Sequence, residues 1–295
     1  MTKLPVTYLA ALALTFNAFV WGVSWWPFRE LQGHGLHPLW ATALIYLFAV
    51  ACVTVVRAAA WRSLCKPSFL WLLVLASGLT NVGFNWAVTV GDVVRVVLLF
   101  YLMPGWVVLL AWPLLGERPT AGSLFRLGLA FVGVVIVLKT PGSPWPVPES
   151  LADGLALMGG FSFALTNVLL RKLNNTPEEA RMLAMFGGGA VMAFIAAVLG
   201  LHIGLVTPVP ELAWSWAGVA IALGLAFLVG NMALQYGAAR LRASTTSLIM
   251  LTEVLYASVS ATLLGAGDLT MRTLLGGAFI LLASLLSVVS FKPTH

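Results

Sequence analysis

The chain has 295 residues, of which 60% are hydrophobic and only 9% are charged. Its mean hydropathy of +0.98 means that it carries more apolar surface than a water-soluble protein of this size can bury. Soluble enzymes, nucleic-acid-binding proteins and disulfide-rich secreted domains are therefore excluded. The apolar runs are long and continuous, which also excludes a β-barrel. An all-α polytopic membrane protein remains.

The apolar runs predict ten transmembrane helices, each close to the length of about 20 residues that spans a bilayer. In chain order they lie at 8–27, 37–57, 69–90, 93–113, 122–140, 152–171, 181–201, 213–236, 243–265 and 273–291. The segments between them are too short to form an extramembrane domain.

The basic residues indicate the orientation of these helices. With the N-terminus inside, all of the 16 Lys and Arg residues fall in inner segments except Arg29, Arg95, Lys139 and Arg272. Since Lys and Arg gather in cytoplasmic loops, both termini are expected in the cytoplasm.

The proline-rich stretch 141–148 divides the chain into two halves of five helices, 1–143 and 144–295. At a shift of 150 residues, Asn81 aligns with Asn231, and Asn85-Trp86 aligns with Gln235-Tyr236. Five is an odd number, so the second half would enter the membrane from the opposite side. Inverted repeats of this kind are typical of carriers that bind their substrate near the midplane, between the repeats.

Amide side chains inside the membrane are the first candidates for a substrate site. Asn81 and Asn85 share one helix face, and Asn231 and Gln235 share the equivalent face in the second half. Amides both donate and accept hydrogen bonds, so they could hold the carboxylate and ammonium groups of an amino acid. The alternative is that they join helices within the bundle.

Aromatic side chains and one further amide extend the candidate site. Asn17 and Trp21 form a stripe on the first helix, and Trp86, Tyr101 and Tyr256 add aromatic surface on the third, fourth and ninth helices. Such a surface suits an aromatic substrate. The alternative for each residue is helix packing or contact with lipid.

Glu253 is the one acidic residue deep inside a predicted span. An intramembrane carboxylate is a candidate functional group, and Glu253 could carry a proton in a coupled transport cycle. The alternative is a structural carboxyl that is hydrogen-bonded within its helix.

The sequence resembles the drug/metabolite transporter superfamily, in its branch of two EamA-type repeats. The resemblance rests on WGVSWWPFREL in the first helix, on Pro104 with Gly116-Glu117 twelve residues later, and on Glu253 in the ninth helix. Val254 stands where the family has a proline, and Gly267-Asp268 stands where a second Gly-Glu is expected. The second half therefore departs from the family pattern, and the resemblance does not support a mechanism that rests on a kinked ninth helix. Within the superfamily the chain looks most like bacterial aromatic amino-acid exporters of the YddG type.

This resemblance implies an exporter of aromatic and other neutral amino acids in the bacterial inner membrane, working by alternating access. The chain contains no phosphate-binding loop, zinc-protease motif or nucleophile elbow, so we expect no catalytic residues, metal or cofactor. The expected partners are a small-molecule substrate and the lipid bilayer, without nucleic acid and with the chain acting as a monomer. An exporter of another metabolite or of lipophilic drugs, a passive channel-like facilitator, and a membrane enzyme or assembly subunit remain as alternatives.

Overall fold

The structure is a computed structural model that describes residues 6–64, 69–90, 96, 99–138, 148, 150–264 and 270–289. Several features singled out in the sequence lie outside these residues. They are Arg95, Lys139, most of the proline-rich stretch 141–148, and Gly267-Asp268.

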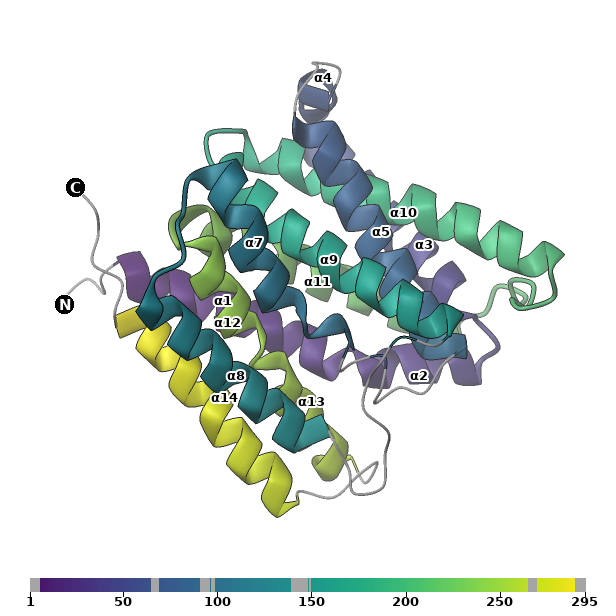
Figure 1. Ribbon diagram of the computed structural model, residues 1–295. Coiled ribbons are helices and arrows are strands. Elements are labelled where there is room, and N and C mark those ends of the chain that lie inside the picture. The colour runs from purple at the N-terminus through teal and green to yellow at the C-terminus, as the bar shows by residue number, and fades with distance from the viewer. Residues whose placement is uncertain are drawn as a thin grey trace, which may run out of the picture.

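The described residues form a bundle of helices and contain no strand (Figure 1). The helices are α1 (Val6–Val23), α2 (Trp25–Gly33), α3 (Pro38–Val56), α4 (Ala60–Leu64), α5 (Phe69–Val90), α7 (Met103–Leu115), α8 (Ala121–Leu138), α9 (Leu151–Lys172), α10 (Glu178–His202), α11 (Trp214–Arg240), α12 (Ala243–Met250), α13 (Glu253–Leu263) and α14 (Met271–Val289).

Seven helical stretches in the described residues are long and apolar enough to cross a membrane. They are Val6–Gly33, Pro38–Val56, Phe69–Ala87, Leu151–Lys172, Glu178–His202, Trp214–Arg240 and Ala243–Leu263. Three shorter apolar helices are Met103–Leu115, Ala121–Ile136 and Leu274–Leu286. Each predicted span overlaps one of these helices, so the hydropathy pattern located the helices well.

Three predicted spans are broken where the sequence predicted a continuous helix, and the fourth of the ten is one of them, with a turn at Tyr101 and Leu102 before α7. The first turns at Ser24, whose hydroxyl donates to the carbonyl of Trp21, and it continues as α2 to Gly33. The ninth is divided into α12 and α13, although Val254 replaces the proline of related proteins. The Thr252 hydroxyl donates a 2.7 Å bond to the carbonyl of Ile249, and the Thr252 amide bonds to the same carbonyl three residues back. The ninth span, predicted as continuous over 243–265, is therefore divided, because a threonine and a tightened turn break the helix here without proline.

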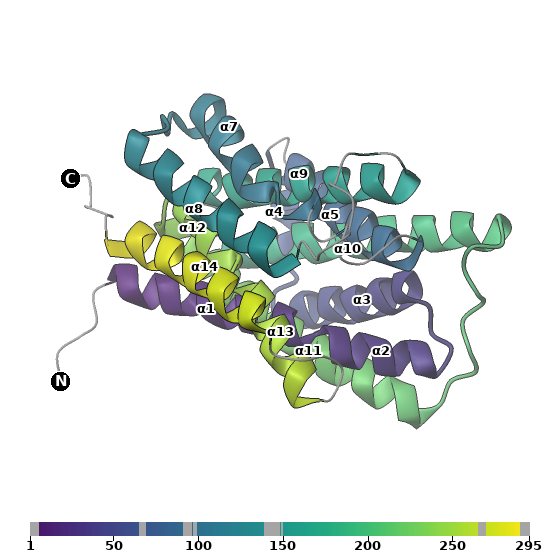
Figure 2. The same cartoon turned by 60° about the horizontal axis from the view of Figure 1, so that its bottom comes forward.

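Helices from the two halves of the chain interleave. Helix α1 packs against α11 and α13, α5 packs against α9 and α10, and α3 packs against α10. Helices α8 and α14 pair with each other at one edge of the bundle (Figures 1 and 2). A central space surrounded by helices of both halves results from this arrangement.

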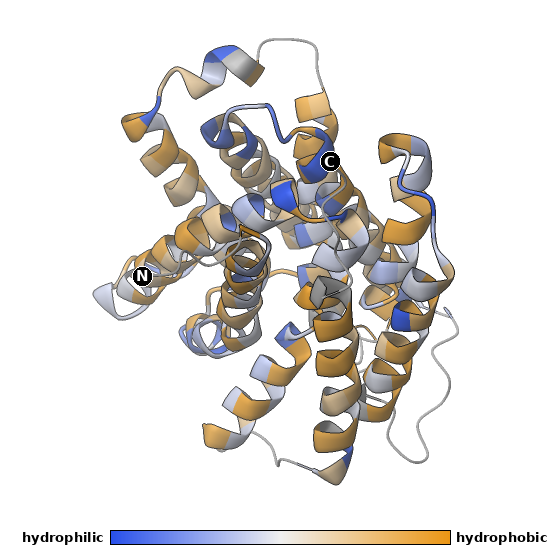
Figure 3. Ribbon diagram, turned by 90° about the vertical axis from the view of Figure 1, so that its left-hand side faces the viewer, coloured by the Kyte–Doolittle hydropathy of each residue, from blue (hydrophilic) through white to orange (hydrophobic). Residues whose placement is uncertain are grey.

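Hydrophobic residues predominate along most helices of the bundle (Figure 3). Large hydrophobic side chains are exposed along the outward faces of several long helices, for example Phe194 and Leu199 on α10 and Leu281 and Leu285 on α14. An apolar surface of this extent matches lipid chains rather than water.

Candidate functional site

A cavity of about 80 Å³ lies inside the bundle, between helices of both halves. Its walls combine aromatic rings, amide and hydroxyl groups, and one carboxyl group. The lining residues are Trp21, Tyr46, Ser77, Thr80, Asn81, Phe84, Asn85, Phe100, Phe163, Thr166, Met185, Phe186, Phe227, Asn231, Leu234 and Glu253.

The aromatic rings form two groups on the cavity wall. In the first, Trp21 stacks on Phe227 with ring centroids 4.5 Å apart, and Tyr46 meets Phe186 edge to face at 5.1 Å. In the second, Phe100 stacks on Phe163 at 5.8 Å and meets Phe84 edge to face at 4.8 Å. Rings held in these geometries offer stiff apolar surfaces on which a planar solute can stack.

Two of the cavity-lining amides are fixed by hydrogen bonds between helices of the first half. Asn81 donates from Nδ2 to the carbonyl of Ser77 at 2.8 Å and accepts from the Tyr46 hydroxyl at 2.8 Å. Asn85 donates from Nδ2 to the Thr42 hydroxyl at 2.6 Å. Both amides are therefore held against α3 in a defined orientation.

Gln235, which is buried away from the cavity, orients the side chain of Asn231. Oδ1 of Asn231 accepts a 2.6 Å bond from Nε2 of Gln235, while Nδ2 of Asn231 lies 3.5 Å from the sulfur of Met185. A thioether is a weak acceptor, so the amide hydrogens of Asn231 can bind a stronger acceptor in the cavity.

Glu253 lies where this cavity joins a second, larger one. It lines both, and its carboxyl is hydrogen-bonded by the hydroxyl of Tyr101 from the first half of the chain. The second cavity has a volume of about 570 Å³ and also contains Arg29 and Gln32 of α2 and Pro38 at the start of α3. It therefore connects the central cavity with the end of the bundle at which α2 meets α3.

Three of the cavity-lining residues lie next to breaks in the helices. Glu253 begins α13 directly after the break at Thr252, Trp21 precedes the break at Ser24, and Tyr101 lies in the turn before α7. Interrupted helices at the substrate site are a common feature of carriers, because the freed backbone and the exposed helix ends can face the solute.

Two close backbone contacts hold these interrupted segments in position. A Cβ atom added at Gly160 of α9 would lie 2.5 Å from the carbonyl oxygen of Phe100. A Cβ atom added at Gly22 would lie 2.8 Å from the carbonyl oxygen of Glu253. Glycine at both positions lets α9 approach Phe100, and α1 approach the start of α13, more closely than any side chain would allow.

The structure gathers six of the residues singled out from the sequence at the two cavities. Trp21, Asn81, Asn85, Asn231 and Glu253 line the central cavity, and Tyr101 lines the larger one.

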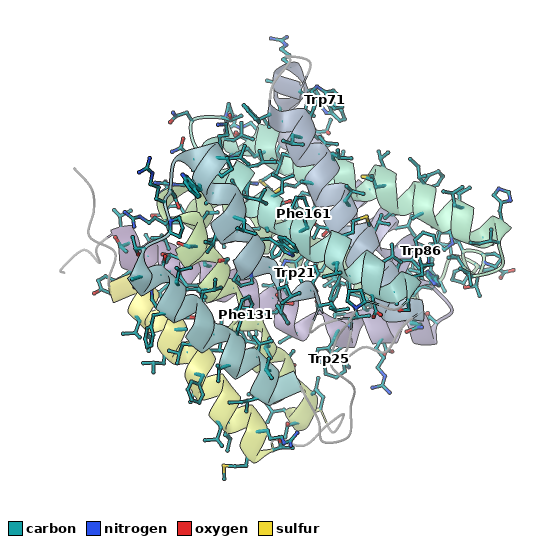
Figure 4. All side chains as sticks on the ribbon, viewed as in Figure 1. Trp21, Trp25, Trp71, Trp86, Phe131 and Phe161 are labelled. Carbon is teal, nitrogen blue, oxygen red and sulfur yellow. The ribbon has the colours of Figure 1, made fainter. Side chains whose placement is uncertain are left out.

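Four of the predicted residues lie elsewhere. Asn17 donates to the carbonyl of Gly230 and joins α1 to α11, and Gln235 is fully buried behind Asn231. Tyr256 packs edge to face against Phe19, and Trp86 lies away from Trp21 along α5 (Figure 4). Of the amide pair on the eighth predicted helix, Asn231 therefore lines the cavity and Gln235 supports it from behind. Residues four positions apart share a helix face but lie at different depths in the bundle, so only one of them reaches the cavity.

Sequence reasoning missed Tyr46 and most of the phenylalanines of the cavity, which are Phe84, Phe100, Phe186 and Phe227. A phenylalanine in an apolar helix carries no sign of facing a cavity rather than lipid. Tyr46 did offer a signal, because its hydroxyl needs a partner inside the membrane, and Asn81 supplies one.

Charged side chains link several helices at the opposite end of the bundle, where α7 turns into α8. Gly116, at φ 72°, ends α7 and turns the chain so that Glu117 lies 3.8 Å from Nε of Arg171 at the end of α9. The backbone N–H of Ala243, at the start of α12, also donates to Glu117 at 3.3 Å, and Arg171 donates to the carbonyl of Ala239. Burial raises the pKa of Glu117, while the charge of Arg171 lowers it. These contacts join the turn after α7 to three helices of the second half.

The described residues contain no group of three His, Cys, Asp or Glu side chains that could hold a metal. The chemistry that this arrangement supports is binding through amide donors, a carboxyl group and aromatic rings.

Comparison with known proteins gives a family match over part of the chain. Residues 8–139 match the EamA-like transporter family. This match covers just under half of the chain, and together with the long apolar helices of the described residues it indicates a multi-pass membrane protein with a transporter-like first half. A search among curated proteins gives no match.

The fold is also similar to those of 28 chains of solved structures. One of them, described as "Crystal structure of protein", superposes with a TM-score of 0.75 and 17% sequence identity, over 96% of this chain and 99% of that chain. At this identity the likeness shows that the fold is shared.

Proposed function

We propose that this protein exports aromatic and other neutral amino acids across the bacterial inner membrane, in the manner of YddG-type exporters. The observation that carries the proposal is the composition of the central cavity. Amide groups and one carboxyl group lie there among seven aromatic rings, contributed by Trp21, Tyr46, Phe84, Phe100, Phe163, Phe186 and Phe227.

Each part of a zwitterionic aromatic solute has a matching group in the cavity. The N–H groups of Asn81 and Asn231 donate to the carboxylate, and Glu253 accepts from the ammonium. The ring of the solute enters between Trp21 and Phe100, where stacked and edge-to-face contacts favour it over an aliphatic chain.

Alternating access between two inverted five-helix repeats, 1–143 and 144–295, is the proposed mechanism. The helix pairing supports it. If α1, α3, α5, α7 and α8 correspond in order to α9, α10, α11, α12–α13 and α14, then the α1–α11 contact corresponds to the α9–α5 contact. Under the same correspondence the α3–α10 and α8–α14 pairs map onto themselves.

The orientation follows from the basic residues, with both termini in the cytoplasm. In that orientation the larger cavity opens outward, and the contacts of Glu117 with Arg171 and Ala243 close the inner end. The described conformation is then the one that releases solute to the outside.

The test is transport by the purified protein in liposomes. Radiolabelled tryptophan, phenylalanine and alanine are compared over a range of concentrations. We expect saturable flux with a lower KM for tryptophan and phenylalanine than for alanine. Asn81→Ala and Asn231→Ala should raise the KM for tryptophan by about tenfold each, the loss expected when a hydrogen bond to a charged group is removed.

Asn17→Ala is the matched control, because Asn17 is also a buried amide that bonds to a helix carbonyl but lies outside the cavity. It should lower thermal stability and leave KM unchanged. No flux of any of the three amino acids would overturn the amino-acid assignment in favour of another metabolite or a lipophilic drug. Flux that does not saturate would indicate a channel-like facilitator instead.

A further inference from the structure

A separate polar pocket of about 430 Å³ lies at the end of the bundle where α7 turns into α8. Its walls come from α7, α8, α9, the start of α12 and the turns between them. Basic and hydroxyl side chains dominate it, namely Arg118, Arg126, Arg171, Arg242, Thr120, Ser123, Ser244 and Thr245. The central cavity shares none of these residues.

The pocket carries more positive charge than its one carboxylate can neutralise. Glu117 is engaged by Arg171 and by the amide of Ala243. Within the part of the chain that the structure describes, Arg118, Arg126 and Arg242 have no carboxylate within ion-pair distance. Arg242 is attracted by Glu117, although not within ion-pair distance, and it is repelled by Arg126. Guanidinium groups that repel each other across one pocket are stabilised when an anion lies between them.

Arg126 also has a buried nitrogen atom that lacks a hydrogen-bond partner among the residues that the structure describes. It lies in the second turn of α8, a helix that is otherwise strongly apolar, and its Nε is buried with no hydrogen-bond partner in the described residues. The rest of this guanidinium group is partly exposed to the pocket, so an acceptor bound there would satisfy the buried Nε as well. Its neighbours Leu124 and Phe125 are exposed on the lipid-facing side of α8.

The pocket also has an apolar wall. Val108, Ala111 and Leu115 of α7 form one wall, next to the basic groups. The pocket therefore presents guanidinium and hydroxyl donors on one side and an aliphatic surface on the other.

We propose that this pocket binds a phosphate group, as carried by the headgroup of an anionic phospholipid or by free inorganic phosphate. Arg126 and Arg242 would bind the phosphate oxygens, with Ser123 and Thr245 as further donors, and the acyl chains of a lipid would lie along α7.

Native mass spectrometry tests the proposal on the full chain in nanodiscs of phosphatidylcholine mixed with phosphatidylglycerol. We expect the wild type to retain phosphatidylglycerol in preference to phosphatidylcholine. The double variant Arg126→Gln/Arg242→Gln should lose this preference by roughly 30-fold, the loss expected for two basic contacts to an anionic headgroup. Arg62→Gln is the control, since Arg62 is an exposed arginine of α4 outside the pocket.

Adding inorganic phosphate distinguishes a lipid headgroup from the free phosphate ion as the ligand. If millimolar phosphate raises the melting temperature of the delipidated wild type and not that of the double variant, the site takes the free ion, whereas protection by phosphatidylglycerol alone assigns it to lipid. Equal retention of both lipids with no effect of phosphate would overturn the proposal. So would a preference for phosphatidylglycerol that the double variant keeps. Both outcomes are independent of amino-acid flux, so they do not depend on the proposed function.

Discussion

The hydroxyl of Tyr46 donates a 2.8 Å hydrogen bond to Oδ1 of Asn81 and so joins α3 to α5 at the wall of the central cavity. The amide nitrogen of Asn81 donates to the carbonyl of Ser77, which leaves one N–H of Asn81 for a solute. A phenol that is 4% exposed thus sets the orientation of a cavity-lining amide.

Tyr46→Phe should weaken substrate binding while the protein still folds. The variant keeps the ring contact with Phe186 at 5.1 Å but removes the donor to Asn81. The loss of about 1 kcal/mol corresponds to a rise in KM of about fivefold. Tryptophan uptake into proteoliposomes measures it. Tyr8→Phe, at an exposed tyrosine of α1, is the control, and an equal effect of both variants would contradict the role of Tyr46.

Glu253→Gln should separate solute binding from coupling to protons. Glu253 lines both cavities and is hydrogen-bonded to Tyr101. Its carboxyl group can therefore exchange a proton with water that enters the larger cavity. If it is the coupling residue, the variant loses accumulation driven by a pH gradient but keeps saturable downhill flux, with a raised KM because the neutral amide of glutamine binds the ammonium group more weakly. Glu211→Gln, at an exposed carboxylate outside both cavities, should keep both activities. Accumulation by Glu253→Gln equal to that of the wild type would exclude a coupling role.

Two alanine substitutions in α9 should have opposite effects on stability. At Gly160 the new Cβ would lie 2.5 Å from the carbonyl oxygen of Phe100, so the variant should lose about 2 kcal/mol and displace Phe100 from the cavity. At Gly154 no atom lies within 4 Å of the new Cβ, so alanine should stabilise the helix by up to about 1 kcal/mol. Thermal unfolding in detergent measures both. A stable Gly160→Ala variant with normal transport would contradict the close contact.

The stability of the protein should depend on pH through Glu117. Burial is the largest influence and raises its pKa above 4.5, against the opposing charge of Arg171. A carboxyl with a raised pKa contributes stability that is complete below its unfolded pKa and is lost as pH rises through the folded pKa. The melting temperature of the wild type, relative to Glu117→Gln, should therefore fall as pH rises above 4.5. A difference between the two proteins that stays constant with pH, or grows with it, would contradict this assignment.

Much of the fold was predictable because the bilayer imposes a simple rule on the sequence. A spanning helix needs a long apolar run, and the expected spans 37–57 and 152–171 correspond closely to α3 (Pro38–Val56) and α9 (Leu151–Lys172). Polar residues inside such runs are costly, so Asn81, Asn231 and Glu253 stand out as candidates from the sequence alone.

What the sequence determined by itself is the set of helices and the polar residues that cannot face lipid. The tertiary structure decided which of those residues meet. Asn17 and Gln235 look like Asn81 and Asn231 in the sequence, but they bond to neighbouring groups and lie outside the cavity lining. The tertiary structure also brings two of the helix breaks together, because Gly22, just before the break at Ser24, packs against the backbone of Glu253, just after the break at Thr252. Helical periodicity assigns each residue to a face of its own helix, whereas a cavity is formed by the relative depth and rotation of several helices, which only their packing sets.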